Sequence, residues 1–383
     1  MDRRKFFSVT GAGAAAAAAG SITGAQAQQQ QWRKGANSCA SGKLPPLKAK
    51  LGHQFGTLTE RSASWVARYG VDAICTSPVI TDPTRLYPTP EEMRKMLDLA
   101  AKWKLNVEMV DSVLLQSSHI DREKNPSIML GQSPQRDRDI EAFQNHIRTC
   151  AATGIKTIKY NMSLLGVVRT NRVPGRGDTL HDRWNAKESL AKNPPLTRAG
   201  VVSPDAFWER IDYFLQRVVP VAAENKVRIA CHPQDPGTPP EGYQGIHNVL
   251  GTIDGMKRFI TMYENQYHGF NFCQGTVSEN LANPRAELFD VIRYFGTRKK
   301  IFNVHFRNIR GVRDDFTDEM FPDEGDIDFV QALKVYREIG YEDMLMPDHV
   351  PVVVPSDPNA QRENFPFAFG YIRGLMQAER SIT

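Results

Sequence analysis

The chain has 383 residues, of which 41% are hydrophobic, and a formal net charge of +5 at pH 7. This length suits one large domain with decorated loops, because a barrel of eight βα units needs about 250 residues. The basic residues are scattered and form no run that would bind nucleic acid, so we expect no nucleic-acid partner. The five cysteines show no paired spacing, which argues against a disulfide scaffold: Cys39, Cys75, Cys150, Cys231 and Cys273.

Residues 1–27 have the features of a twin-arginine signal peptide. Arg3 and Arg4 precede a weakly apolar Ala/Gly stretch, and Ala25-Gln26-Ala27 is a small-residue cleavage site. We therefore expect export in the folded state and a periplasmic location, with residues 28–47 forming a flexible N-terminal segment. No later stretch approaches the roughly 20 apolar residues that span a bilayer, so we expect no membrane contact after the signal is removed.

From about Lys48, short apolar runs alternate with longer amphipathic stretches, the pattern of a parallel sheet built from βαβ units. The candidate strands are Ala49–Gln54, Ala73–Ser77, Asn106–Asp111, Thr157–Asn161, Arg228–His232, Gly269–Cys273, Ile301–His305 and Met344–Asp348. The candidate helices are Thr59–Tyr69, Pro90–Trp103, Asp137–Ala152, Pro204–Asn225, Ile253–Tyr267, Pro284–Phe295, Ile327–Ile339 and Phe365–Ala378. Eight evenly spaced units favour an α/β fold of the (β/α)8 or TIM-barrel type over a sandwich or a doubly wound sheet. Residues 48–383 then form a single catalytic domain.

Two local features accompany this alternation. Gly154, Gly296 and Gly340 stand where the C-caps of helices are expected. The polar segment Val167–Val202 is rich in Arg, Gly and Pro, and we interpret it as an extended βα loop after the fourth strand. Such loops lie on the functional face of this fold.

Four residues with metal-ligating side chains end the last four candidate strands: His232, Cys273, His305 and Asp348. Active sites of TIM barrels form at the C-terminal ends of the strands, so these side chains should lie close together. Each has an ordinary alternative role; a cysteine in an apolar strand, for example, is usually a small core residue. Their common position on successive strands nevertheless predicts a metal site. Two imidazoles, a thiolate and a carboxylate suit Mn²⁺, Fe²⁺, Co²⁺ or Zn²⁺, and the ligand types do not choose among them.

Several polar residues neighbour the predicted ligands. His349 is a candidate general acid or base if the chain turns after Asp348; its alternative is a supporting hydrogen bond. Arg307 is a candidate clamp for a substrate carboxylate, or alternatively forms a salt bridge on the rim. Tyr160 and Asn161 end the fourth strand, where they could hydrogen-bond a polyol.

Other acidic residues have less specific expectations. Asp111 ends the third strand, and Asp235 lies in a proline-rich loop after the fifth. The segment after the seventh strand is acidic, and most of its carboxylates should be solvated or cap the next helix: Glu319, Asp323, Glu324, Asp326 and Asp328.

A metal beside an acid–base histidine and a carboxylate clamp suits one kind of chemistry. The metal binds an α-hydroxy acid or hydroxy carbonyl, acidifies the adjacent C–H and stabilises an enediolate. The enediolate can then expel a β-hydroxyl, which is dehydration, or be reprotonated elsewhere, which is isomerisation or epimerisation.

At these residues the chain resembles the mannonate dehydratase family. The similar motifs are V-R-I-A-C-H-P-Q-D-P, F-C-Q-G, V-H-F-R, G-D-I-D and P-D-H, and the similarity extends over roughly residues 220–375. The resemblance implies a xylose-isomerase-like TIM barrel that binds Mn²⁺ through the four strand-end residues, with His349 in proton transfer. It also implies a lyase that dehydrates D-mannonate to 2-keto-3-deoxy-D-gluconate in carbohydrate metabolism.

The chain departs from the family pattern in several places. Thr76-Ser77-Pro78 stands where the family has paired histidines after the second strand, and Phe365–Phe367 contains no tyrosine where the family has a functional one. The loop after the fourth strand and the export signal also differ. These departures suggest a divergent, exported paralogue that acts on a sugar, sugar acid or oxidised glycoside.

Three functions follow from these observations. The first is a sugar-acid hydro-lyase, the second a metal-dependent sugar isomerase, epimerase or lyase, and the third a non-catalytic sugar-binding protein. Binding alone needs neither four ligands nor His349, so the third is the least favoured. All three predict a small-molecule sugar or sugar-acid partner, and the sequence is compatible with a homo-oligomer.

Overall fold

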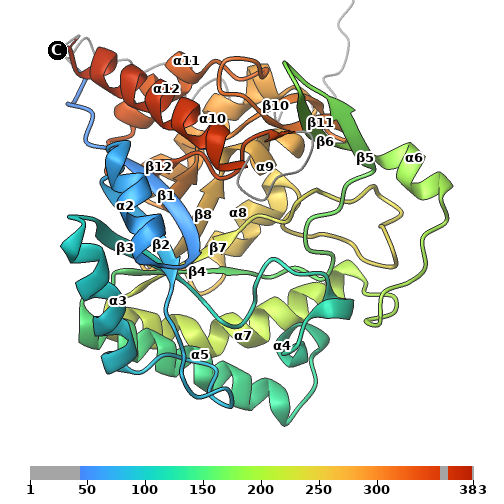
Figure 1. Ribbon diagram of the computed structural model, residues 1–383. Coiled ribbons are helices and arrows are strands. Elements are labelled where there is room, and N and C mark those ends of the chain that lie inside the picture. Colours follow the sequence, from blue (N-terminus) through green and yellow to red (C-terminus); the bar gives the residue numbers. More distant parts are fainter. Residues whose placement is uncertain (1–43, 354–360, 382–383) are drawn as a thin grey trace, which may run out of the picture. The chain divides into compact units, whose positions relative to one another are not determined.

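A computed structural model of the protein describes residues 44–353 and 361–381. The predicted signal peptide with Arg3, Arg4 and the cleavage site, residues 28–43 of the flexible segment, and Cys39 lie outside these residues. The described chain forms a closed barrel of eight parallel strands in the order β1-β12-β9-β8-β7-β4-β3-β2 (Figure 1). The predicted TIM barrel is therefore confirmed.

The barrel strands agree closely with the predicted runs. Their bounds are β1 (Lys50–Thr57), β2 (Ala73–Ser77), β3 (Asn106–Asp111), β4 (Thr157–Asn161), β7 (Arg228–His232), β8 (His268–Cys273), β9 (Ile301–His305) and β12 (Met344–Met346). The prediction for the last strand was too long. β12 ends before Pro347, which has no backbone N–H for the ladder, so Asp348 lies just beyond the strand.

The parallel register brings the strand ends to one rim. Asn161 of β4 pairs with His232 of β7, and Cys273 of β8 pairs with His305 of β9. His305 in turn lies beside Met346, the last residue of β12. The predicted ligands therefore start from neighbouring backbone positions.

Eight long helices surround the barrel, as predicted: α2 (Glu60–Arg68), α3 (Pro90–Lys102), α5 (Gln135–Thr153), α7 (Pro204–Asn225), α8 (Ile253–Thr261), α10 (Pro284–Thr297), α11 (Phe329–Glu338) and α12 (Gln361–Ser381). Side-chain N-caps start most of them; Thr59, Thr89 and Ser203, for example, each accept a backbone N–H of the first turn. α8 ends earlier than predicted, because the chain turns at Tyr263 with a positive φ. None of the described helices combines the length and apolar character needed to cross a membrane.

Apolar side chains fill two layers of the barrel. The larger cluster lies between the strands and the helices, and includes Ile74, Ile158 and Ile229 on the outward faces of β2, β4 and β7. A smaller cluster comes entirely from barrel strands and fills the interior: Ala73, Cys75, Met109, Ala230, Phe302, Met344 and Met346. Beyond this apolar layer, toward the C-terminal rim, the inward-facing residues Lys159 and Asn161 of β4 are polar.

An additional antiparallel sheet covers one side of this rim. The predicted loop Val167–Val202 does connect β4 to α7, but it contains β5 (Asn171–Pro174), β6 (Thr179–Asn185) and the short α6 (Ala186–Ala191). β6 pairs with β11 (Asp315–Met320) and β13 (Val352–Val353), and β11 pairs with β10 (Asn308–Val312). We call this five-stranded sheet, seen beside α6 in Figure 1, the rim sheet. No pattern in the sequence indicates that the segments after β4, β9 and β12 pair with one another.

Two of the three predicted C-cap glycines occupy such positions. Gly154 caps α5 with φ +79°, and Gly340 follows the end of α11 with φ +66°. The prediction for Gly296 was wrong, because it lies inside α10. There it is buried, and a Cβ would come within 2.1 Å of Ile339 Cδ1 on α11. Its small size thus serves helix packing and not helix termination.

Gly296→Ala should lower the free energy of unfolding by about 1–3 kcal/mol, because the added methyl overpacks the contact between α10 and α11. The matched control is Gly370→Ala in α12, where a Cβ would meet no atom within 4 Å. That change should raise stability by up to about 1 kcal/mol through helix propensity. Chemical denaturation of both variants measures the difference. If Gly296→Ala were as stable as Gly370→Ala, the packing role of Gly296 would be contradicted.

Candidate metal centre and pocket

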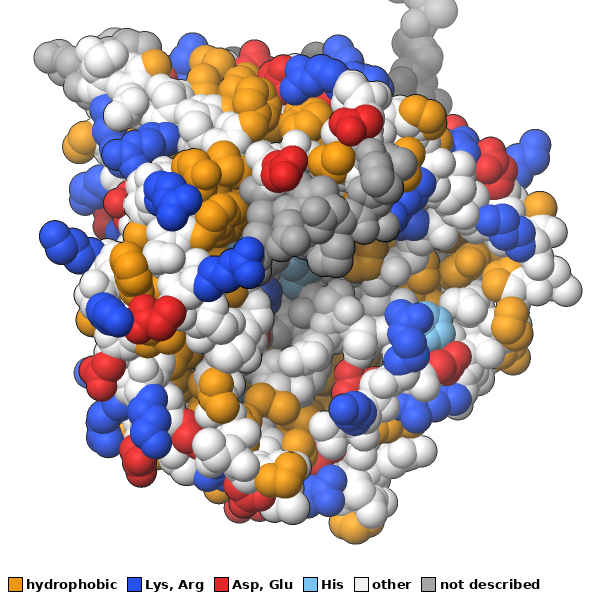
Figure 2. All heavy atoms as spheres, in the orientation of Figure 1, with side chains coloured by type: hydrophobic (Ala, Val, Ile, Leu, Met, Phe, Trp, Pro, Cys, Tyr) orange, Lys and Arg blue, Asp and Glu red, His pale blue; other side chains and the backbone are white. Residues whose placement is uncertain are grey.

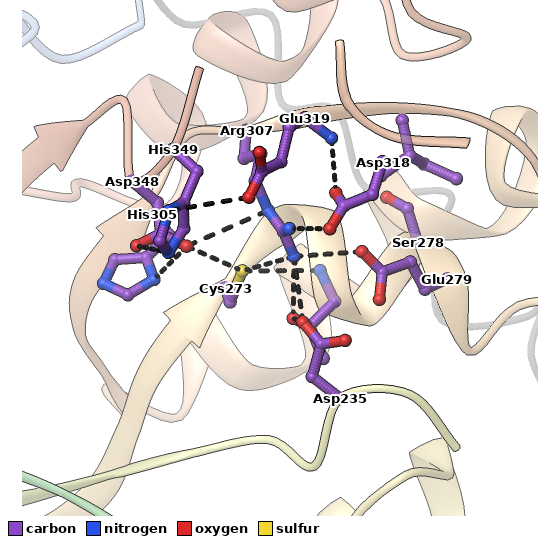
Figure 3. Close-up of polar contacts among 12 residues, drawn as sticks. Asp235, Cys273, Ser278, Glu279, His305, Arg307, Asp318, Glu319, Asp348 and His349 are labelled. Carbon is purple, nitrogen blue, oxygen red and sulfur yellow. Dashed lines mark hydrogen bonds and ion pairs between the residues drawn. The ribbon is translucent and has the colours of Figure 1, made fainter. Parts of the chain in front are cut away.

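The four predicted ligands come together at the C-terminal rim of the barrel. One ligand atom from each of His232, Cys273, His305 and Asp348 lies within 4.8 Å of all the others. His305 Nδ1 is 3.1 Å from Asp348 Oδ2, and Cys273 Sγ is 4.0 Å from the same oxygen (Figure 3). Ligands on one metal ion are separated by roughly 3–4.5 Å at ordinary bond lengths. The arrangement is therefore a plausible metal site.

The two imidazoles are oriented for metal binding. His232 Nδ1 lies 2.6 Å from the carbonyl oxygen of Pro233, so this nitrogen carries the proton and Nε2 keeps its lone pair. The Asn271 amide lies 3.2 Å from His305 Nε2. His305 Nδ1 is buried and has no hydrogen-bond partner among the described residues. A bare buried nitrogen facing a carboxylate fits a cation between them.

Cys273 differs electrostatically from the other described cysteines. Burial alone would raise the pKa of its thiol, but the charge of Arg307 and the contact with His305 outweigh burial, and the pKa is lowered. Cys273 is also the N-cap of the short α9 (Gln274–Glu279), where the Thr276 N–H points to Sγ at 3.4 Å. Burial instead raises the pKa of Cys231 to about 12. Cys273 is therefore prepared as a thiolate, whereas Cys231 is a core residue.

Asp348 is ionised despite its burial. Desolvation would raise the pKa of its carboxyl, but the nearby His305, His349 and Arg307 hold that pKa well below its usual range. The Gln54 amide, from β1, donates to Oδ1. This hydrogen bond links the ligand to the other half of the barrel.

His349 faces the pocket next to the ligands, as the sequence suggested. Its side chain is 49% exposed, and its Nε2 lies 3.6 Å from Asp348 Oδ1. Its Nδ1 lies 3.5 Å from Glu319 Oε1 on β11 (Figure 3). The charge of Asp348 is the main cause of the raised pKa of His349. The negative charge of Asp348 therefore favours the protonated form of the imidazole beside the metal centre.

Glu319 corrects one expectation about the acidic segment. It is largely buried against His349 and not solvated, and desolvation raises the pKa of its carboxyl to about 7. Asp328 does cap a helix, since it accepts the Gln331 N–H at the start of α11. Asp323 pairs with Arg176 on the surface. The sequence could not identify Glu319 as a site residue, because only the rim sheet brings it next to His349.

Arg307 is a buried structural cation and not a free clamp. Its guanidinium donates to Asp318 of β11, to Glu279 Oε1 at 3.0 Å and to Asp235 Oδ2 at 3.2 Å, and it approaches Cys273 Sγ at 3.4 Å. Its terminal nitrogens are thus committed to groups of the protein. The alternative of a salt bridge at the rim is therefore confirmed, in buried form, whereas the predicted clamp is not favoured, because protein carboxylates already occupy the guanidinium.

A second acidic cluster adjoins Arg307. Asp235, Glu279 and Asp318 lie close enough together to suggest a further cation site. However, Arg169 as well as Arg307 donates into this cluster. Burial raises the pKa of Glu279 well above its usual value, so two guanidinium groups face two carboxylates and a neutral acid. The cluster is therefore already charge-balanced.

Tyr160 and Asn161 point in opposite directions. Asn161 lines the pocket. The Tyr160 ring is buried behind the barrel wall, with centroids 5.5 Å from Phe143 and 5.4 Å from Phe214. Successive strand residues face opposite sides of a sheet, so this is the expected alternation. The predicted substrate contact of Tyr160 is thus corrected, and its inward-facing neighbour Lys159 was missed.

A pocket of about 480 Å³ opens beside the ligand quartet. Asp348 and His349 line one end, and most of the rest is lined by residues of β1–β4 and of the loop after β3: Gln54, Phe55, Gly56, Ser77, Asp111, Ser112, Leu115, Gln116, Ser117, Lys159 and Asn161. Phe365 of α12 also contributes. Figure 2 shows a hollow in this face with a histidine side chain on its wall. The volume is sufficient for a small polar ligand.

The sequence of residues 184–382, about half of the chain, matches the model of the D-mannonate dehydratase family. The chain belongs to the mannonate dehydratase family. A mannonate dehydratase of Thermotoga petrophila is 29% identical over 292 residues, which are 68% of this chain and 77% of that protein. Mannonate dehydratase 2 of Halalkalibacterium halodurans is 30% identical over 249 residues, 58% of this chain and 70% of that protein.

Solved structures share the barrel fold at low sequence identity. The crystal structure of mannonate dehydratase from Streptococcus suis superposes with a TM-score of 0.70 at 18% identity, covering 87% of this chain and 95% of that one. D-psicose 3-epimerase from Clostridium cellulolyticum superposes with a TM-score of 0.56 at 12% identity, covering 85% and 99%. The protein is thus a mannonate-dehydratase-like enzyme with a candidate metal site, and its relatives are hydro-lyases.

Cys273→Ala should lower the affinity for metal by about 100-fold or more, because it removes one of the four ligands; losses of 10- to 100-fold are usual even for residues that only support ligands. Elemental analysis after dialysis against limiting metal gives the comparison with the wild type. Cys150→Ala is the control, since Cys150 is a buried cysteine on the outer helix α5. Equal metal content in all three proteins would refute the site.

Proposed function

We propose that this protein is a metal-dependent sugar-acid dehydratase that converts D-mannonate to 2-keto-3-deoxy-D-gluconate and water. The observation that carries the proposal is the convergence of four metal-ligating side chains beside a pocket that Asp348 and His349 line. Membership of the mannonate dehydratase family supplies the reaction and the substrate class. The polar lining of the pocket suits a substrate rich in hydroxyl groups.

The donor set fits a divalent transition metal, and we propose Mn²⁺, with Fe²⁺, Co²⁺ and Zn²⁺ as alternatives. His232, Cys273, His305 and Asp348 would hold it. When bound, the metal would supply Lewis-acid stabilisation of the negative charge that develops on the substrate oxygens. The lowered pKa values of Cys273 and Asp348 favour the anionic forms that bind a metal ion.

Dehydration breaks the C2–H and C3–O bonds: the C2 proton passes to a base, a proton delivered to the C3 hydroxyl releases it as water, and the enol that remains becomes the 2-keto acid. His349 is suited to protonate the leaving C3 hydroxyl, because the charge of Asp348 raises its pKa and favours the protonated ring. Glu319 lies against Nδ1 and orients the ring, so Nε2 is the atom left to exchange a proton with substrate. Arg307 stabilises the Cys273 thiolate and has no direct role in this proton transfer.

One observation favours a second candidate, a metal-dependent sugar isomerase or epimerase. Phe365 lines the pocket in the segment where the family resemblance implies a tyrosine, and none of the described residues that line the pocket is a tyrosine. A dehydratase that lacks the hydroxyl of this tyrosine must rely more heavily on His349 for proton transfer. Reprotonation of the substrate, which gives an isomer or epimer, requires no leaving hydroxyl to be protonated.

His349→Asn should reduce kcat about 10²- to 10⁴-fold while leaving bound metal unchanged, because it removes the proton donor and no ligand. The assay is incubation of the Mn²⁺-loaded protein with D-mannonate, with mass spectrometry to detect the loss of water. His247→Asn is the matched control, since His247 lies in the loop after β7 and does not line the pocket.

The products separate the two candidate functions. Formation of 2-keto-3-deoxy-D-gluconate supports the dehydratase. A product of unchanged mass would instead support the isomerase or epimerase. Absence of 2-keto-3-deoxy-D-gluconate at every metal loading would refute the dehydratase proposal.

We also propose that the enzyme acts in the periplasm after twin-arginine export. The Arg3-Arg4 pair and the Ala25-Gln26-Ala27 site support this proposal. Export in the folded state would let the thiolate site acquire its metal before the protein crosses the membrane. In fractionated cells, Arg3→Lys/Arg4→Lys should retain the full-length protein in the cytoplasm, while the parent chain appears, shortened, in the periplasm. Identical distributions would contradict export by this route.

A further inference from the structure

The half of the pocket opposite the metal ligands is built by the first four barrel strands. Besides Asn161, four polar side chains from these strands line the pocket: Gln54 from β1, Ser77 from β2, Asp111 from β3 and Lys159 from β4. We call these four residues the polar wall. All four lie outside residues 184–382, the region that matches the family model. The match to the family model therefore assigns no role to the polar wall.

Hydrogen bonds connect the polar wall into one network. Lys159 Nζ lies 2.8 Å from Asp111 Oδ1 and donates to Gln54 Oε1 at 2.7 Å. Ser77 Oγ donates to Asp111 Oδ2 at 3.1 Å. The amide of Gln54 donates in turn to the predicted ligand Asp348. The network thus runs from the metal centre across the pocket to β2.

Lys159 and Asp111 remain partly accessible within this network. Their side chains are 15% and 19% exposed, and both line the pocket. An ammonium group has three N–H donors, of which the observed contacts use two, and a carboxylate has about four acceptor positions. The pair therefore still offers a donor and acceptors to a ligand.

The charge balance of the polar wall indicates what it recognises. Lys159 and Asp111 neutralise each other, so a ligand carboxylate would meet a wall with no net charge. Hydroxyl groups both donate and accept hydrogen bonds, and they match a surface that presents donors and acceptors side by side. The cationic end of the pocket is the metal centre with His349, which suits the carboxylate.

We propose that Lys159, held in place by Asp111 and Gln54, binds hydroxyl groups in the tail of a sugar acid whose carboxylate and α-hydroxyl lie at the metal centre. This inference rests on the proposed function, because it takes the ligand to be a sugar acid oriented by the metal. It makes Lys159 a specificity-determining residue. It also explains why β4 carries the polar Lys159 opposite the metal ligands, at a position where an apolar residue would be easier to bury.

Calorimetric titration of the metal-loaded full chain tests the proposal with two kinds of ligand. D-mannonate and D-gluconate have a carboxylate, an α-hydroxyl and a polyol tail, whereas glycolate has only the first two groups. Lys159→Met should weaken binding of the better six-carbon acid by about 10- to 100-fold, the loss expected for a hydrogen bond to a charged group. Binding of glycolate should change less than about two-fold, since the same bonds at the metal end are retained.

Lys156→Met is the matched control, because Lys156 is exposed at the opposite end of β4. It should bind all three acids as the wild type does. Metal content and thermal unfolding of each variant show whether the fold is intact. If the unpaired charge of Asp111 prevents the Lys159→Met variant from folding, the double variant Lys159→Met/Asp111→Asn removes both charges. Ser77→Ala offers a second test, since it should selectively weaken binding of the six-carbon acid by a few-fold.

Two results would overturn the proposal. One is a wild type that binds neither six-carbon acid more tightly than glycolate, since no tail would then be recognised. The other is an equal loss of glycolate and six-carbon acid in Lys159→Met, which would place Lys159 at the carboxylate. Where D-mannonate is turned over during the titration, D-gluconate alone is scored for binding, so a protein that passes this test but forms no 2-keto-3-deoxy-D-gluconate loses the dehydratase proposal alone.

Discussion

The buried guanidinium of Arg307 holds the metal centre together. It contacts Cys273 from the barrel, Asp235 from the loop after β7 and Asp318 from the rim sheet. Taking these charges out of water is unfavourable, and only the close carboxylates compensate for it; removing one member of such a buried group costs about 3–5 kcal/mol. The same cation lowers the pKa of the Cys273 thiol. One interaction therefore joins the folding of three chain segments to the ionisation of a ligand.

The barrel separates two tasks between its halves. Strands β7, β8, β9 and the end of β12 supply the ligands, and strands β1 to β4 supply the polar wall of the pocket. Gln54 connects the two, since it bonds both Asp348 and Lys159. The chemistry common to the family can thus be kept on one side, while the surface that selects among substrates differs on the other.

The sequence was sufficient for features that depend on local patterns. Apolar runs at regular spacing located the barrel strands, and His232, Cys273, His305 and Asp348 were found because each ends such a run. Lys159 was missed although strand alternation places it on the same side as Asn161. Glu319 and Asp318 could not be predicted, because they contact His349 and Arg307 through the rim sheet, which is assembled from segments far apart in the sequence. Pairing between loops leaves no periodic signal in any one of them.

The rim sheet has a consequence for how this enzyme can diverge. TIM barrels usually acquire new activities by changing their βα loops one at a time, since each loop is anchored independently. Here β6, β11 and β13 belong to three different loops and hydrogen-bond to one another. An insertion or deletion in any one would shift Glu319 and the segment beside His349 together. Evolutionary change should therefore accumulate at the ends of β1 to β4, whose side chains can be exchanged without disturbing the catalytic half.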